Sequence, residues 1–359
     1  MSHVPLMTYP EAIVVGLIQG VSELFPVSSL GHNVLIPALV GGNWAKTLNV
    51  AAPESPYLAF IVGLHVATAL ALLIYFWRDW VRIIRGFFSS IRDRDIVTAD
   101  QKLAWMIIVA TIPVGLTGLL FEKMFREIFG TPILAAVFLV VNGVILFAGE
   151  KFRTSKSRQA DAEVAAERRQ AMAPARVQHE PAAVGLAAAA DGSAAITGPP
   201  PRRPGHGNHA AAKPDPKTAR AAQTAAGVRA DRRLSALDFA QTLIIGSAQI
   251  LALLAGISRD GVTMAAGMFR GLSREDAARF AFLLATPVIL AAGALKVPNL
   301  IQKGHGMYGP ILVGSILSGI GAYISVRFLV RYFQTRTLTP FAIYCFVFGL
   351  GSIIYLKVR

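Results

Sequence analysis

The amino-acid sequence predicts an all-α, polytopic integral membrane protein, and three observations support this fold class. Hydrophobic residues make up 54% of the 359 positions and charged residues 16%, with a mean hydropathy of +0.52. Several apolar runs approach or exceed the roughly 18 residues that mark a bilayer-spanning helix. The net charge of +14 is concentrated between these runs. Together these features exclude a water-soluble domain.

The first apolar stretch, residues 10–40, is interrupted at Pro26, Gly31 and Pro37. Each uninterrupted piece is too short to cross about 30 Å of hydrocarbon, so a broken or re-entrant pair of helices is expected. Three further spans are expected in this half, at 58–77, 104–120 and 132–148.

The composition changes abruptly at residue 150 to Ala, Arg, Pro and Gly, without hydrophobic periodicity, and this continues to residue 236. Such a composition predicts a disordered cytoplasmic linker, in which 161–169 is the one stretch suited to a short exposed helix. The predicted organisation is a first membrane repeat at 1–149, the linker at 150–236 and a second membrane repeat at 237–359.

The second half opens with another apolar stretch, residues 239–257, broken at Gly256. A second broken helix pair is therefore expected. Three spans are expected to follow it, at 280–295, 309–330 and 340–356.

The two halves resemble each other around their breaks. Residues 18–23 are echoed by 244–249, and residues 26–31 by 256–261. Internal similarity of this kind, with a broken helix in each half, is typical of inverted-topology repeats. The sequence therefore predicts two inverted repeats whose breaks meet near the middle of the membrane.

The location of the positive charge argues against a nucleic-acid partner. Residues 150–233 contain 15 Lys and Arg against 8 Asp and Glu, and residues 78–103 contain six Lys and Arg. An excess of Lys and Arg in selected loops is the positive-inside pattern of an inner-membrane protein. It places 78–103 and the linker inside and 41–57 and 121–131 outside.

Polar residues within the first broken segment are candidates for function, because such residues are costly at membrane depth. Gln19 and Glu23 are four residues apart and share a helix face. Ser28 and Ser29 come just before the second helical piece, whose exposed amides and dipole favour an anion. His32 follows at a spacing that can bring its imidazole onto the face of the two serines.

The second break supplies a cation. Arg259 lies at a predicted helix start, between Ser258 and the pair Asp260 and Gly261, and Thr263 lies on the following turn. A guanidinium binds phosphate oxygens in a bidentate manner. The expected ligand is an anion, most simply a phosphate or diphosphate.

At these residues the sequence resembles the undecaprenyl-diphosphate phosphatases of the BacA/UppP family. The first family motif is matched by Gln19, Glu23 and Phe25-Pro26-Val27-Ser28-Ser29-Leu30-Gly31-His32. The second, which in the family reads Pro-Gly-x-Ser-Arg-Ser-Gly, is matched by Ala255-Gly256-Ile257-Ser258-Arg259-Asp260-Gly261. Ala255 and Asp260 depart from it, and Asp260 adds negative charge beside the expected phosphate.

The resemblance implies hydrolysis of undecaprenyl diphosphate to undecaprenyl phosphate and inorganic phosphate, which recycles the lipid carrier of peptidoglycan synthesis and confers bacitracin resistance. It implies Ser29 as the nucleophile or as the residue that positions a water, with Glu23 and His32 handling protons or metal. Arg259 is implied to bind the diphosphate. The remaining expected phosphate-binding residues are Gln19, Ser28, Ser258, Gly261 and Thr263.

The resemblance also implies a divalent cation, Mg²⁺ or Ca²⁺, with Glu23 as a ligand, in a multi-pass protein of the bacterial inner membrane whose site opens to the outer leaflet. The expected partners are a polyprenyl diphosphate lipid and membrane lipids, with a homodimer as a further possibility. The alternative function is a transporter or flippase of a lipid phosphate or small anion, since inverted repeats with broken helices are transporter architecture. A catalytically inactive family member is a third reading.

Overall fold

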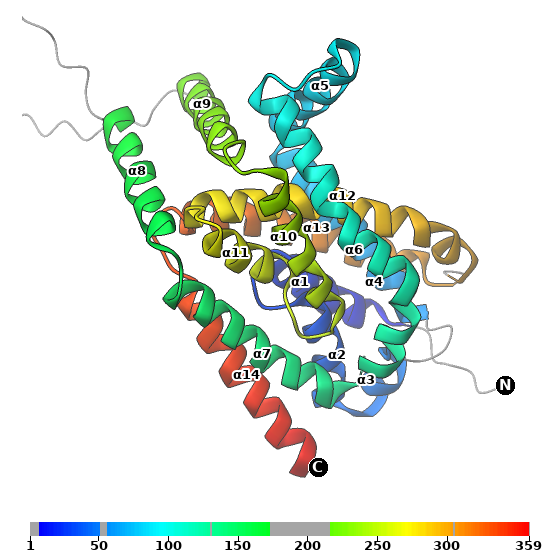
Figure 1. Cartoon of the computed structure of the whole chain (residues 1–359). Coiled ribbons are helices and arrows are strands. Elements are labelled where there is room, and N and C mark those ends of the chain that lie inside the picture. The colour runs from blue at the N-terminus through cyan, green and yellow to red at the C-terminus, as the bar shows by residue number, and fades with distance from the viewer. Residues whose placement is uncertain (1–6, 51–55, 130, 173–215, 304–305, 359) are drawn as a thin grey trace, which may run out of the picture.

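The computed structural model describes residues 7–50, 56–129, 131–172, 216–303 and 306–358 (Figure 1), and in these ranges it contains helices and no strands. The first half contains α1 (Tyr9–Ser22), α2 (Ser29–Val40), α3 (Gly42–Thr47), α4 (Pro56–Tyr75), α5 (Trp77–Asp93), α6 (Ala99–Phe129) and α7 (Pro132–Lys151). Then follow α8 (Ser155–Met172), α9 (Pro216–Leu234), α10 (Phe239–Ala248), η1 (Gln249–Leu253), α11 (Arg259–Phe269), α12 (Arg274–Lys303), α13 (Tyr308–Tyr332) and α14 (Thr339–Val358).

The helices confirm a multi-pass membrane protein. Five of the described helices are long and apolar enough to cross a membrane: α6, α7, α12, α13 and α14. The number of spans rises to seven if each of two bent helix pairs counts as one span. One bent pair joins α4 to α5 at 85°, and the other joins α9 to α10 and η1 at 103°. Five of the six uninterrupted spans predicted from hydropathy each lie within one helix, and the sixth, 58–77, runs across the bend between α4 and α5.

Both predicted breaks are present. The first break lies between Ser22 and Ser29, and Gly256 lies in the second with a φ of +115°. The predicted interruptions at Gly31 and Pro37 are wrong, because both residues lie inside α2. Gly31 occupies the first turn, where a backbone N–H needs no helical partner, and a proline near the end of a helix removes a single hydrogen bond.

The two halves are interlocked through their helix pairs. α1 packs against α13, α10 against α6, α4 against α12, and α7 against α14. A Cβ at Gly20 would overlap the carbonyl oxygen of Ser318, and a Cβ at Gly246 that of Ala110, so these glycines permit the close packing of α1 on α13 and of α10 on α6. These are the contacts that inverted repeats require, and the repeat relationship itself stays a prediction.

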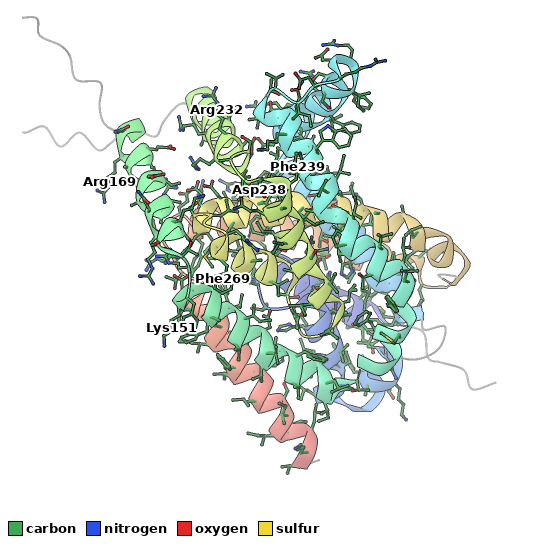
Figure 2. The ribbon with its side chains drawn as sticks, viewed as in Figure 1. Lys151, Arg169, Arg232, Asp238, Phe239 and Phe269 are labelled. Carbon is green, nitrogen blue, oxygen red and sulfur yellow. The ribbon has the colours of Figure 1, made fainter. Side chains whose placement is uncertain are left out.

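Part of the predicted linker is helical. The prediction of disorder is wrong for α9 and for the rest of α8, whereas the short helix expected at 161–169 is confirmed within α8. Both helices lie with α5 at the top of the view in Figure 1, and α3 and the C-terminal end of α14 lie at the bottom. Arg169 of α8 and Arg232 of α9 are labelled there in Figure 2. Ala, Arg and Glu are strong helix formers. Ion pairs to α5 and α12, which composition cannot reveal, hold both helices, and residues 173–215 lie outside the described residues.

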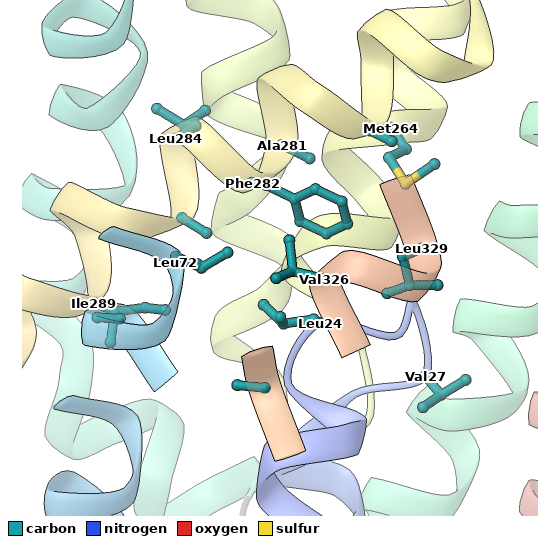
Figure 3. Close-up of a cluster of buried hydrophobic side chains, with 14 of the residues drawn as sticks. Leu24, Val27, Leu72, Met264, Ala281, Phe282, Leu284, Ile289, Val326 and Leu329 are labelled. Atoms are coloured by element: carbon teal, nitrogen blue, oxygen red, sulfur yellow. The ribbon is translucent and has the colours of Figure 1, made fainter. Parts of the chain in front are cut away.

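Apolar side chains from both halves pack beside the first break. Leu24 lies in a cluster with Phe282 of α12 and Val326 and Leu329 of α13, and all four are fully buried (Figure 3). The backbone of the break is therefore fixed by packing from the second half, so a site built there has a rigid support.

Candidate active site

The two breaks are joined by hydrogen bonds. The Asn142 side chain of α7 donates to the carbonyl of Pro26 at 2.9 Å and accepts from the amide of Ser258 at 3.0 Å. The amide of Gly256 donates to the Ser28 hydroxyl at 3.2 Å. Residues more than two hundred positions apart thus form one buried polar region, as the sequence predicted.

Glu23 lies at the centre of this region and is buried. Its Oε1 accepts a hydrogen bond from Arg259 at 2.6 Å. Its Oε2 accepts from the Gln19 amide at 2.9 Å and from the Ser29 hydroxyl. Four predicted site residues, one of them from the second half, therefore meet at one carboxylate.

A fourth partner of Glu23 is His65 of α4, which was not among the predicted site residues. Its Nε2 lies 3.3 Å from Glu23 Oε2, and its Nδ1 lies 2.8 Å from the carbonyl oxygen of Ile61. Because both ring nitrogens face oxygen acceptors, the protonated ring satisfies both. The signal that could have found His65 is that it is an ionisable residue inside the predicted span 58–77.

Asn33 is a second missed residue. Its side-chain amide donates to Gln19 Oε1 at 2.7 Å. This bond fixes the orientation of the Gln19 amide, so that its Nε2 faces Glu23. Asn33 therefore supports the carboxylate through Gln19.

Ser28 has a structural role at the break. Its φ of +68° lies in the left-handed region, which is unfavourable for a residue with a side chain. Its hydroxyl accepts from the amides of Gly31 and Gly256, each at 3.2 Å. The hydroxyl thereby caps α2 and joins the two breaks.

The second break is capped in the same way. The Ser258 hydroxyl accepts from the amide of Gly261 at 3.1 Å, and the Thr263 hydroxyl donates to the carbonyl of Arg259 at 2.8 Å. A Cβ at Gly261 would lie 3.3 Å from the Cβ of Pro26, so Gly261 permits close contact between the breaks. Phosphate binding by these residues stays a prediction.

His32 lies away from the serine hydroxyls. Its Nδ1 is 2.7 Å from the carbonyl oxygen of Ser28, and its Nε2 is 2.7 Å from the Tyr344 hydroxyl. Since a carbonyl can only accept, Nδ1 carries the proton and Nε2 accepts from Tyr344. The ring also stacks on Phe348 with centroids 5.1 Å apart. Its two ring nitrogens therefore bond a backbone carbonyl and Tyr344, and neither bonds the hydroxyl of Ser28 or Ser29.

Three buried polar atoms beside Glu23 have no hydrogen-bond partner in the described part of the chain. They are Arg259 Nε and both carboxylate oxygens of Asp260, and Arg259 Nε lies 3.8 Å from Asp260 Oδ1. An unsatisfied buried donor costs free energy and marks a place where a ligand oxygen or water binds. The free donor of Arg259 thus suits an anion.

The described site residues suit a metal ion only when oxygens of the substrate complete its coordination. No group of three or more His, Cys, Asp or Glu among the described residues is arranged to hold a metal. Glu23 and Asp260 both flank the guanidinium of Arg259. Mg²⁺ is commonly bound by one or two carboxylates together with substrate phosphate oxygens. The two carboxylates therefore suit an ion held jointly with a diphosphate.

Comparison with known proteins gives a consistent result. A family model described as "Bacitracin resistance protein BacA" matches residues 12–174 and 217–351. An "Undecaprenyl-diphosphatase" of Mycolicibacterium paratuberculosis is 52% identical over 354 residues, covering 98% of this chain and 99% of the relative. "Undecaprenyl-diphosphatase 1" of Frankia casuarinae is 50% identical, covering 95% and 96%. "Undecaprenyl-diphosphatase 2" of Chromobacterium violaceum is 36% identical, covering 96% and 98%.

Proposed function

The chain belongs to the BacA family, and from that premise we infer that it is a membrane enzyme that hydrolyses undecaprenyl diphosphate to undecaprenyl phosphate and inorganic phosphate. This reaction recycles the lipid carrier of peptidoglycan synthesis and confers bacitracin resistance. The observation that carries the inference is that Ser29 and Arg259 both bond the buried carboxylate of Glu23. A transporter needs no serine bonded to a carboxylate.

Substrate binding begins with Arg259. Its Nε is free, while one terminal nitrogen is held by Glu23. A diphosphate offers oxygens to the whole guanidinium fork, and charge-assisted bonds of this kind are about twice as strong as neutral ones. The arriving diphosphate therefore competes with Glu23 for Arg259.

This competition activates the carboxylate. Before binding, Glu23 is neutralised by Arg259 and by the ring of His65. Once Arg259 turns to the diphosphate, Glu23 loses a cationic partner and becomes more basic toward the Ser29 proton. Substrate arrival and base activation are thereby coupled.

The chemical step takes one of two routes from this geometry. In one, Ser29 gives its proton to Glu23, its oxygen bonds to the terminal phosphorus, the anhydride P–O bond breaks, and water later hydrolyses the phosphoserine. In the other, Ser29 positions a water that loses its proton to Glu23 and attacks directly. Both release undecaprenyl phosphate and inorganic phosphate, and both depend on in-line positioning and charge neutralisation.

Glu23 and Asp260 would hold a divalent cation, Mg²⁺ or Ca²⁺, together with the diphosphate, and the cation would neutralise charge on the phosphate oxygens. Asp260, which replaces the serine of the family motif, would then serve as a ligand of the cation. The proposal places the protein in the inner membrane, with the site open to the outer leaflet. Its support is the Arg-rich character of α5, α8 and α9 on the opposite side.

The test is inorganic phosphate release from undecaprenyl diphosphate by the purified full-length protein, with and without a chelator. Arg259→Ala is expected to lower turnover at least about 100-fold, since it removes the charge that binds the phosphate. Arg270→Ala, at the other end of α11, is the matched control and should retain activity. Undiminished release by Arg259→Ala would contradict the mechanism, and lipid movement without phosphate release would favour the transporter.

A further inference from the structure

A polar cavity lies on the side of α5, α8 and α9. It has a volume of about 810 Å³ and is lined by the ends of α4 and α13, the start of α5, and parts of α9 and α12. Tyr75, which lines it, lies ten residues beyond His65 on α4, or about 15 Å along the helix axis. The cavity is therefore separate from the active site.

The acidic residues of this cavity are already neutralised. Asp79 pairs with Arg82 at 2.6 Å and with Arg279 at 3.1 Å. Glu275 pairs with Arg168 of α8. Neither carboxylate is left to neutralise the other arginines of the lining.

Three arginines of the lining carry unpaired charge. Arg327 and Arg331 form no ion pair in the described part of the chain, and both are exposed. Arg78 donates to the Thr224 hydroxyl at 3.0 Å and lies over the Trp77 ring, and it too has no ion pair with a described residue. The lining is therefore strongly cationic.

The positions of these residues on α13 are regular. Tyr323, Arg327 and Arg331 follow at intervals of four residues, so they lie on one face of the helix, and all three line the cavity. Tyr323 also contacts Tyr75 edge to face, with centroids 6.0 Å apart. One helix face thus presents two free guanidinium groups above an aromatic wall.

The cavity lies at the level of the membrane–water interface. α5 turns away from α4 by 85° at Trp77, whose side chain is 56% exposed. The exposed apolar residues of α5 recur every three or four positions, at Trp77, Val81, Ile84, Phe88 and Ile91. Such a stripe on an Arg-rich helix is typical of helices that lie in the plane of the interface.

An apolar surface adjoins the charged lining. Ile74, which lines the cavity, is 63% exposed, and Val330 lines it as well. On the neighbouring face of α13, Ile324 and Phe328 are exposed large apolar side chains. A ligand that used both surfaces would have an anionic head and an apolar tail.

We propose that this cavity binds the phosphate headgroup of an anionic membrane lipid, through Arg78, Arg327 and Arg331, with the acyl chains against Ile74 and the exposed face of α13. Basic cavities between membrane helices on the positively charged side are suited to such headgroups. A free phosphate ion would use the arginines but not the apolar wall. The site is independent of the active site and of the reaction proposed there.

The experiment measures lipid-dependent thermal stabilisation of the full-length protein in detergent, because a ligand that binds the folded state raises its midpoint of unfolding. Phosphatidylglycerol is expected to raise the midpoint and phosphatidylcholine to have little effect. The double variant Arg327→Gln/Arg331→Gln should need at least tenfold more phosphatidylglycerol for the same rise. Arg336→Gln, four residues beyond the end of α13 and outside the cavity, is the matched control and should behave as wild type.

Three outcomes would overturn the proposal. The first is an undiminished response of the double variant, with its lipid-free midpoint confirming that it is folded. The second is an equal response to phosphatidylcholine. The third is inorganic phosphate producing the same rise and abolishing the response to phosphatidylglycerol, which would assign the cavity to a free anion.

Discussion

At the scale of single residues, the carboxylate of Glu23 organises the site because its two oxygens face different parts of the chain. Oε1 is held by Arg259 from the second half, and Oε2 by Gln19, Ser29 and His65 from the first half. A diphosphate can displace Glu23 from Arg259 without disturbing the other three contacts. His65 therefore remains as the cationic partner of Glu23 during the chemical step.

His65 is accordingly expected to act as a positioning residue. His65→Phe should lower kcat by about 100-fold, because Glu23 loses the group that orients it and a positioned general base contributes at least about this factor. KM should change little. His65→Gln keeps one donor for Glu23 and should recover part of the loss. Steady-state phosphate release by the purified variants measures both constants. A rise in KM with unchanged kcat would instead assign His65 to substrate binding.

Ser28 offers a test of strain against hydrogen bonding. Ser28→Gly accommodates the φ of +68° but removes the hydroxyl that accepts from Gly31 and Gly256, whereas Ser28→Ala removes the hydroxyl and keeps the strain. An unsatisfied buried amide costs about 1–3 kcal/mol, and a strained residue about 1–3 kcal/mol. Both variants should unfold at lower temperature than wild type, and Ser28→Ala at the lowest. Equal midpoints for the two variants would show that the backbone carries no strain there.

The site was partly predictable because its central residues stand out in an apolar segment. Glu23, Arg259 and Ser29 are costly at membrane depth, so the sequence alone marks them as site candidates. His65 obeys the same rule but lies in an apolar span without a predicted break, and Asn33 lies one residue beyond the motif that ends at His32. The partners of His32 could not be predicted, since Tyr344 is more than three hundred residues away.

At the scale of helices, hydropathy predicts the membrane spans, whereas α8 and α9 are held in place by ion pairs to other helices. Asp231 of α9 is 1% exposed and accepts from Arg82 of α5 and from Arg279 of α12. Arg233, two residues on, bonds both carboxylate oxygens of Asp276. Such contacts between distant segments leave no mark in local composition, so a segment rich in Ala, Arg and Pro resembled a disordered linker.

Asp231→Asn is therefore expected to destabilise the protein by about 1–3 kcal/mol, because it leaves part of a buried charge network unpaired while Asp79 still partners both arginines. Denaturant unfolding in detergent, followed by helical circular dichroism, measures the change. Asp93→Asn is the matched control, since the ion-pair partner of Asp93 among the described residues is the exposed Arg92 on the surface of α5. A stability of Asp231→Asn equal to that of the control would show that α9 docks without this ion pair.

At the scale of the whole molecule, neither half forms the site or the core alone. Glu23 comes from the first half and Arg259 from the second, and Asn142 joins the two breaks by hydrogen bonds to each. The helix pairs α1 with α13, α4 with α12, α6 with α10 and α7 with α14 all cross between the halves. The halves therefore contact each other along the full set of long helices.

This interlocking predicts that the two halves reassemble when they are produced as separate chains. Residues 1–172 and 216–359, co-expressed, should copurify and release phosphate from undecaprenyl diphosphate, because all described contacts of the site and of the helix pairs remain available. Each half alone should be inactive. The matched control pairs a first half carrying Glu23→Gln with an unchanged second half; it should copurify equally well yet lose at least about 100-fold in turnover, as expected for removal of a general base. Activity in either half alone would contradict a site shared between them, and failure of the halves to copurify would show that the covalent connection is needed for the helix pairs to form.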